Sequence, residues 1–487
     1  INPSNMRVVD VARLLNSTSF GFVLAQARLY REFNRVGFRI GSSENPRNIN
    51  LLKYIAWMFD RKHTPEETSG ARSYEDRRNA ERDRQAEQSL AGRDIGPLPE
   101  VVNPNRKAAC ERNFQLFCES YFPETYALAW SPDHLKVIEK IETAVLRGGL
   151  FALALPRGSG KTTITESAAL WSMLYGHREF VVLIGATESA ALELLDSLKT
   201  ELEVNERLAE DFPEVCYPVA QLEGIANRCA GQLYKGERTR ITWTSNEIVL
   251  PTVEGSRASG IIVRVAGITG RIRGMKFKRS DGRNVRPSLV VIDDPQTSES
   301  AGSLEQTRKR VRVLAGDILG LAGPGQKISG IMPCTIIRPG DMADIILNRN
   351  THPDWNGEKT RMVYRFPTNM KLWEEYAEIR AEALRTEGNF QKATEFYLAN
   401  REAMDAGAEV SWEARFNHDE VSALQHAMNL KFQDEAAFQS EYQNDPLPDD
   451  TADDSLLSVD GICAKINGLA RRRVPLKCDR LTMFVDV

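Results

Sequence analysis

The chain has 487 residues, of which 42% are hydrophobic and 27% are charged, and its formal net charge is −4. This length predicts two or three domains of roughly 100–200 residues, and the charge balance excludes a protein that is basic over its whole surface. The seven cysteines include no C-x-x-C pair, which argues against a disulfide framework or a zinc site. No apolar run approaches the roughly 18 residues that a membrane span needs, so no membrane association is expected.

Residues 1–60 are expected to form a small helical domain. Apolar side chains recur at helical spacing from Val8 to Leu15, and a second helical stretch, 22–33, carries arginines. Two short helices before a basic hairpin are typical of a winged-helix or helix-turn-helix DNA reader, and a helical docking domain fits the pattern equally well. Residues 61–106 alternate acidic and basic side chains and end in a Gly/Pro-rich stretch, which predicts a charged helical linker.

Residues 107–367 are expected to form an α/β domain. A helix should begin at Ser131, a good N-cap residue followed by Pro132. Most of the later apolar runs are continuous rather than alternating, which indicates strands buried on both faces of a mostly parallel sheet. Strands are predicted at 150–155, 180–185, 239–244, 261–265, 289–292 and 328–332, and helices at 162–175, 189–203 and 304–318.

One predicted strand runs into a phosphate-binding loop. The apolar run Leu150–Leu155 is followed by Pro156-Arg157-Gly158-Ser159-Gly160-Lys161-Thr162-Thr163 and then by a helical pattern. Glycines let backbone N–H groups surround a phosphate at a helix N-terminus, while the lysine reaches the β- and γ-phosphates and the Thr162 hydroxyl ligates Mg²⁺. The usual motif has a further glycine where this chain has Leu155, and a plain strand-to-helix turn is the alternative.

A second apolar run, Leu289–Ile292, ends in Asp293 and Asp294. A buried strand that ends in acids is the partner that a phosphate-binding loop requires. Asp293 is expected to hold the Mg²⁺ shell, and Asp294 to orient or deprotonate the attacking water. Together the two segments predict a nucleotide hydrolase that uses ATP and Mg²⁺, with the loop as Walker A and the acids as Walker B.

These motifs resemble the large subunit of a tailed-bacteriophage terminase. That family often lacks the first loop glycine and has an arginine shortly after it, here Arg157. It also has a Gly-rich segment with arginines before the acid strand, here Gly267–Gly274, and a strand that ends in a hydroxyl residue, here Thr335. The resemblance covers residues 110–487 and implies a P-loop NTPase fold of the ASCE/RecA-like class. Many members have Glu where this chain has Asp294.

The resemblance also implies residue roles. His134 falls where the family contacts adenine, and an ordinary helix-start residue is the alternative. Arg157 is expected to act as an arginine finger in cis, Arg273 (or Arg271) in trans on a neighbouring subunit, and Thr335 to couple hydrolysis to movement. For the arginines of the Gly-rich segment, DNA-backbone contact or plain solvation is the alternative.

The C-terminal part is expected to link the motor to a nuclease. Residues 368–448 are helical in pattern, and 449–487 are acidic and then form a strand that carries Asp486. In the family this strand begins an RNase H-like nuclease whose acids hold two metal ions. The chain ends just after Asp486, so its nuclease site is expected to be incomplete and cleavage of DNA is not expected, although the full-length family has an endonuclease.

The implied function is an ATP-driven motor that moves double-stranded viral DNA into a procapsid. The implied partners are the DNA, the portal protein, a small terminase subunit and further copies in a ring, which is expected to be a pentamer. The implied location is the host cytoplasm during virion assembly, outside the mature virion. The alternatives are a P-loop DNA helicase of another type and a DNA-binding portal adaptor with an inactive nucleotide site.

Overall fold

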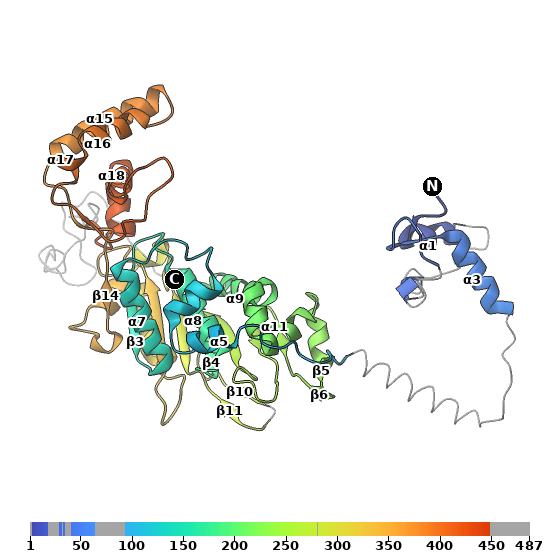
Figure 1. Ribbon diagram of the computed structural model, residues 1–487. Coiled ribbons are helices and arrows are strands. Elements are labelled where there is room, and N and C mark those ends of the chain that lie inside the picture. Colours follow the sequence, from blue (N-terminus) through green and yellow to red (C-terminus); the bar gives the residue numbers. More distant parts are fainter. Residues whose placement is uncertain are drawn as a thin grey trace, which may run out of the picture. The chain divides into compact units, whose positions relative to one another are not determined.

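The computed structural model describes residues 2–17, 29–31, 33–34, 40–63, 93–279 and 281–448 (Figure 1). The chain divides into two compact units, Ile1–Glu87 and Gln88–Val487, and the division falls inside the predicted linker 61–106. The predicted nuclease strand and Asp486 lie outside the described residues. Among the helices described, none is long and apolar enough to cross a membrane.

The first unit is small and partly described. Strands β1 (Met6–Arg7) and β2 (Asn48–Ile49) pair antiparallel, beside helices α1 (Val8–Asn16) and α3 (Leu51–His63). Its core includes Val11, Ile49 and Tyr54, all fully buried. Most of the predicted helix 22–33 lies outside the described residues, so the winged-helix hypothesis stays a prediction.

The second unit is built on an eight-stranded sheet, which confirms the predicted α/β class with a mostly parallel sheet. Its strand order is β14-β3-β13-β12-β4-β9-β8-β7, and the first six strands run parallel. The bounds are β3 Leu150–Ala154, β4 Phe180–Gly185, β7 Thr242–Trp243, β8 Glu247–Val249, β9 Ile262–Gly267, β12 Leu289–Asp293, β13 Ser329–Cys334 and β14 Glu358–Lys359.

Helices cover both faces of this sheet because its strands are apolar on both. In β12, Val291 faces one core and its neighbours Val290 and Ile292 face the other. One face carries α5 (Pro104–Cys110), α6 (Phe114–Tyr121), α7 (Pro132–Leu146), α8 (Lys161–Leu174), α9 (Glu188–Val204), α10 (Glu206–Asp211) and α11 (Pro213–Ala220). The other carries α13 (Leu304–Val313), the π-helical turn η2 (Leu314–Ile318) and α14 (Met342–Leu347).

Shorter elements complete this part of the chain. They are the short helix α12 (Ser298–Ala301), the 3₁₀ turns η1 (Ala226–Gly231) and η3 (Pro353–Trp355), and the hairpins β5–β6 (Leu233–Tyr234, Glu237–Arg238) and β10–β11 (Phe277–Lys278, Asn284–Val285).

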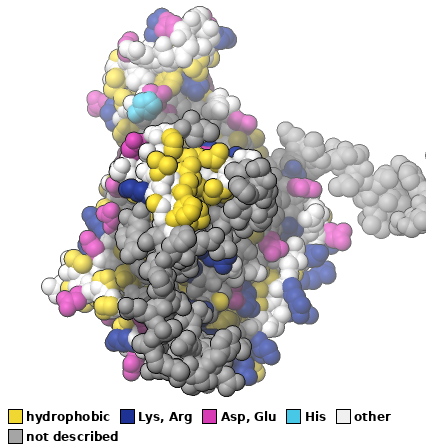
Figure 2. Space-filling model, turned by 90° about the vertical axis from the view of Figure 1, so that its right-hand side faces the viewer, with side chains coloured by type: hydrophobic (Ala, Val, Ile, Leu, Met, Phe, Trp, Pro, Cys, Tyr) yellow, Lys and Arg dark blue, Asp and Glu magenta, His cyan; other side chains and the backbone are white. Residues whose placement is uncertain are grey.

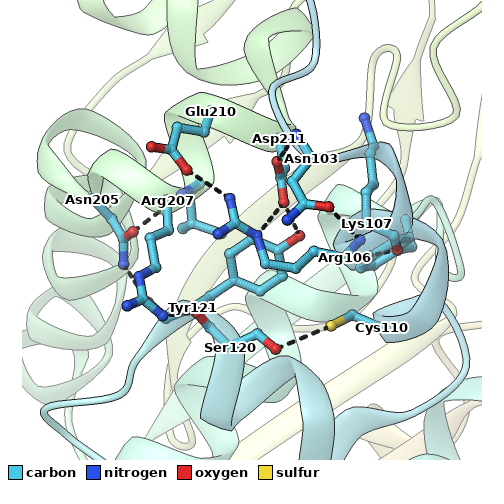
Figure 3. A network of polar contacts seen from close by, with 12 residues as sticks. Asn103, Arg106, Lys107, Cys110, Ser120, Tyr121, Asn205, Arg207, Glu210 and Asp211 are labelled. Carbon is cyan, nitrogen blue, oxygen red and sulfur yellow. Dashed lines mark hydrogen bonds and ion pairs between the residues drawn. The ribbon is translucent and has the colours of Figure 1, made fainter.

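The predicted linker ends too late in the sequence. The described residues 93–106 belong with the sheet unit, where the side chain of Asp211 is fully buried (Figure 3). Its carboxylate accepts hydrogen bonds from Arg106 Nε at 2.6 Å, from the Tyr121 hydroxyl at 2.7 Å and from the Asn103 backbone N–H at 3.0 Å. A buried carboxylate needs such donors, so this network holds α5 and the segment before it against α10.

A helical subdomain follows the sheet. It contains α15 (Met370–Thr386), α16 (Gln391–Ala399), α17 (Arg401–Asp405), α18 (Ala423–Gln433), α19 (Glu435–Ala437) and the π-helical turn η4 (Phe438–Tyr442). The expected helical character of 368–448 therefore holds. A strand pair that was not expected, β15 (Val363–Arg365) with β16 (Glu409–Val410), pairs the chain that enters the subdomain with the segment between α17 and α18. Trp373, Tyr376 and Tyr397 form its own aromatic core.

Candidate nucleotide-binding site

Three neighbouring strands deliver the predicted site residues to one edge of the sheet. The loop 156–160 follows β3, Thr335 follows β13, and Asp293 ends β12. Strand β13 lies between β3 and β12, and all three are parallel. Their carboxyl ends therefore meet at the same edge, where open α/β sheets bind ligands.

The loop has the backbone shape that its glycines allow. Gly158 and Gly160 have φ values of 75° and 74°, in the left-handed region that other residues rarely adopt. Gly160 is the N-cap of α8, a helix of 14 residues, so the free N–H groups of that helix begin at the loop. The Ser159 hydroxyl donates a hydrogen bond to the Pro156 carbonyl at 2.7 Å and closes the turn.

Lys161 lies between Asp294, the predicted catalytic base, and Thr335, the predicted coupling residue. Its ammonium is 3.0 Å from Asp294 Oδ2 and donates a hydrogen bond to the Thr335 hydroxyl. Asp294 adopts φ 35°, and its backbone N–H donates to the Pro333 carbonyl at 3.1 Å. A non-glycine residue with positive φ is uncommon and often marks a functional position. Asp294 follows Lys161 by 133 positions and Thr335 follows Asp294 by 41, and the structure brings all three together.

Thr162 and Asp293 form the second half of the site. The Thr162 hydroxyl lies 3.1 Å from Asp293 Oδ2 and 3.3 Å from Oδ1. Burial, followed by the negative charge of Asp294, raises the pKa of Asp293 to about 6. A hydroxyl and a carboxylate are oxygen ligands that suit Mg²⁺, which usually takes its remaining ligands from phosphates and water. Among the described residues, no three His, Cys, Asp or Glu side chains converge on a further metal position.

Arg157 is held by the helical subdomain. Its backbone N–H donates to the Glu441 carbonyl at 2.7 Å, and its exposed guanidinium lies 3.5 Å from the Glu441 carboxylate. Arg415 donates to the Arg157 carbonyl from the other side, and its guanidinium stacks over the ring of Tyr442. Sequence reasoning missed Glu441 and Arg415, because no local signal links them to a loop more than 250 residues earlier.

A pocket of about 570 Å³ lies at this site, between the glycine loop, Asp294, Thr335 and Glu441. Gln296, also missed, contributes to its wall. Its carbonyl accepts a hydrogen bond from the Met342 N–H at 2.9 Å, and its amide group hydrogen-bonds to the Asp341 carboxylate. Gln296 therefore ties the wall of the pocket to the start of α14. The lining residues are Arg157, Gly158, Gly160, Lys161, Thr162, Thr163, Asp294, Gln296, Thr297, Ser298, Thr335, Ile337 and Glu441.

His134 lies beneath the loop rather than in this pocket. The ring is buried, Nδ1 pairs with Ser131 in a capping box, and Nε2 lies 3.0 Å from the Ser159 carbonyl. Burial lowers the pKa of His134, which favours the neutral ring and donation from Nε2 to the carbonyl. The structure shows the helix-start role and adds that the ring supports the loop. Contact of His134 with adenine stays a prediction.

A second pocket, also of about 570 Å³, adjoins the start of α7. Trp130, Asp133, Tyr364 and Trp412 line it, and the Tyr364 hydroxyl donates to Asp133 at 2.8 Å. The Trp412 indole donates to the Ala129 carbonyl at 2.7 Å and packs edge-on against His134. This pocket lies between the start of α7 and residues 409–414 of the helical subdomain. Its aromatic walls suit a planar group.

Arg273 does not reach the pocket that Lys161 lines. It follows β9, two strands beyond β12, and its exposed guanidinium pairs with Asp317 at 2.5 Å. It lines a separate hollow of about 380 Å³ together with Arg271. The structure of one chain therefore excludes Arg273 from its own nucleotide site in this conformation, and a role in trans stays a prediction.

A comparison of the sequence with models of known protein families finds no match, and a search of curated proteins finds none either. The similarity to terminase large subunits therefore rests on the residues quoted above.

Proposed function

We propose that this chain binds and hydrolyses ATP with Mg²⁺ at the pocket lined by Lys161. One observation carries the proposal: Lys161, Thr162, Asp293, Asp294 and Thr335 converge from three adjacent strand ends around a glycine loop. A lysine, a hydroxyl and two carboxylates in this arrangement match the needs of phosphoryl transfer, in which the protein positions groups and stabilises charge.

The residues act in a definite order in this mechanism. In the structure Lys161 is paired with Asp294, so entry of a triphosphate draws the ammonium toward the phosphates and frees the carboxylate. Asp294 then accepts a proton from the attacking water, whose oxygen bonds to the γ-phosphorus as the bond to the β–γ bridging oxygen breaks and ADP leaves. Thr162 and Asp293 would hold Mg²⁺, which would supply positive charge to the phosphates. The Arg157 guanidinium leaves the Glu441 carboxylate and binds the γ-phosphate, where it stabilises the negative charge of the transition state.

We further propose that hydrolysis drives movement along double-stranded DNA, as in the motor of a tailed-phage terminase. The contacts that support coupling run from the loop to the helical subdomain. Arg157 is bound to Glu441 in η4, and the N–H of Ile336, the residue after Thr335, donates to the Asn444 side chain at 3.1 Å. Loss of the γ-phosphate at Thr335 or Arg157 thus acts directly on the segment that ends the subdomain.

The wider proposal follows the terminase resemblance. It includes a pentameric ring of copies on a portal, a small terminase subunit, and work in the host cytoplasm during virion assembly. A helicase with two motor lobes is less well supported, because the described residues after β14 fold into a helical subdomain around Trp373 and not into a second α/β lobe.

The test is steady-state ATP hydrolysis by the chain with and without long duplex DNA. We expect Mg²⁺-dependent turnover that duplex DNA stimulates and that Asp294→Asn removes. Asp196→Asn, which changes an exposed acid on α9 paired with Lys199, is the matched control and should retain turnover. Absence of turnover at protein concentrations high enough for ring assembly, with MgATP still bound, would favour an adaptor with an inactive site.

A further inference from the structure

The hairpin β10–β11 is anchored to the sheet unit, at whose lower edge it lies in Figure 1. Phe277 and Val285 face each other across it; Val285 is buried, and Phe277 packs against the same core. Arg279 fastens the turn, since its guanidinium donates to the Ser259 carbonyl at 3.0 Å. The hairpin is therefore held in a defined position on the surface of the sheet unit.

Its charge differs sharply from that of the rest of the chain. Lys and Arg lie interspersed with Asp and Glu on the face shown in Figure 2, and the net charge of the whole chain is −4. Residues 271–286 carry one acid, Asp281, and seven cations: Arg271, Arg273, Lys276, Lys278, Arg279, Arg283 and Arg286. A local excess of this size in an acidic chain points to an anionic partner.

Internal ion pairs account for only part of this charge. Arg273 pairs with Asp317, and Arg279 and Arg283 share Asp281 and Glu179. Lys276, Lys278 and Arg286 are exposed and have no ion pair among the described residues. We call these three side chains the cationic ribbon.

The register of the hairpin sets the cationic ribbon on one side. Phe277 pairs with Val285 and Lys278 with Asn284, so Lys276 stands opposite Arg286 just outside the paired residues. Side chains alternate along a strand, so Lys276 and Lys278 point away from the buried Phe277 side. Like charges in opposed positions destabilise a strand pair. An anion against this side of the hairpin would offset the repulsion between Lys276 and Arg286.

We propose that the cationic ribbon binds the sugar-phosphate backbone of duplex DNA. Lys276 and Lys278 lie exposed along a ribbon, and Arg286, whose side chain runs past Gly323, lies exposed at its base. Cations spread in this way, instead of converging on one point, suit a repeating polyanion better than a single small anion. Their outward face has no apolar side chain of the kind that a protein interface core would need, and a two-stranded ribbon fits the major groove of B-form DNA. The use of this contact in translocation rests on the proposed function.

The experiment measures binding of a fluorescein-labelled duplex by anisotropy between about 50 and 200 mM salt, without nucleotide. The test variant is Lys276→Gln/Lys278→Gln/Arg286→Gln. The matched control is Lys371→Gln/Arg385→Gln/Lys392→Gln, which removes three exposed cations of the helical subdomain. We expect the slope of log affinity against log salt to fall by about 3 in the test variant, at about 0.9 per phosphate contact, and to stay unchanged in the control.

Three results would overturn the proposal. The first is an unchanged affinity and salt slope in the test variant. The second is an equal loss in the control, which would mean a diffuse charge effect. The third is loss of self-association with duplex binding intact, which would assign the cationic ribbon to an acidic protein surface. ATP binding is measured on the same proteins: its absence in the unmodified chain refutes the proposed function, whereas normal ATP binding with unaltered duplex binding refutes only this inference.

Discussion

Binding of MgATP should depend on a proton held by Asp293. Its pKa of about 6 lies above the ordinary value of 3.8 because the carboxyl is buried and Asp294 is adjacent. Mg²⁺ needs the carboxylate, so the proton and the metal ion compete. At pH 5, one unit below this pKa, about ten of eleven sites carry the proton, and the affinity for MgATP should fall about tenfold from its value at pH 8.

The same pKa affects folding in the absence of ligand. The folded protein holds this proton more tightly than the unfolded chain, so the contribution of Asp293 to stability is fully present below pH 3.8 and is lost as the pH rises toward 6. The difference between the two pKa values corresponds to about 3 kcal/mol, at about 1.36 kcal/mol for each pKa unit. Above pH 6 this much stabilisation is absent until Mg²⁺ and nucleotide bind.

Calorimetric titration of MgATP between pH 5 and 8 measures the effect, with Asp294→Asn as the comparison. Nucleotide phosphates also titrate near pH 6, and equally for both proteins, so the difference between the two profiles isolates Asp293. Asp294→Asn removes the adjacent negative charge and should move the midpoint to lower pH. Equal midpoints in the two proteins, or an affinity that is constant over the whole range, would refute the reasoning.

Three further predictions concern single residues. Asp211→Ala leaves Arg106 without its buried partner and should lower the free energy of unfolding by about 3–5 kcal/mol in urea titrations; a loss below 1 kcal/mol would contradict the network described. Gln296→Ala removes a wall side chain that is tied to Asp341 and Met342, and should lower the turnover number for ATP roughly 10- to 100-fold, at about 1.36 kcal/mol per tenfold, with a smaller change in ADP affinity; equal losses of both would point to a folding defect instead. Glu441→Gln should weaken the hold on Arg157 and raise the ATP affinity several-fold in fluorescent-nucleotide titrations, and a decrease would show that Glu441 supports the loop rather than competing with phosphate.

Local patterns were enough to predict the central part of the fold. The run from Leu150 is bounded by Pro156 and followed by glycines, and strand β3, the loop and α8 begin and end within about one residue of the predicted positions. The runs at 180–185 and 289–292 match β4 and β12 in the same way, since strands buried on both faces give continuous apolar runs. Lys161, Thr162, Asp293 and Asp294 were predicted from these patterns, and Thr335 from the terminase resemblance; the structure brings all five together.

Other features depend on contacts between distant parts of the chain. The helix predicted for 304–318 changes to a π-helical turn at Leu314, and the long helical stretch after Leu372 is divided by a turn at Gly388, where φ is +70°. Docking of 93–106 depends on Asp211, over 100 residues later. Glu441 and Arg415 reach the loop only because the helical subdomain packs against it. The burial of His134 under the loop depends on the same packing, and neither feature has a sequence signal of its own.

The most direct test of the central claim is the binding of MgATP by the unmodified chain and by Lys161→Ala, measured by calorimetry at pH 7.5. Lys161 joins the loop, Asp294 and Thr335, and it is the cation that the site offers to the β- and γ-phosphates. We predict saturable binding to the unmodified chain with one nucleotide per chain, and a loss of at least tenfold in Lys161→Ala with the fold intact. Equal binding by the two proteins, or no binding by either, would contradict the assignment of this edge of the sheet as a nucleotide site.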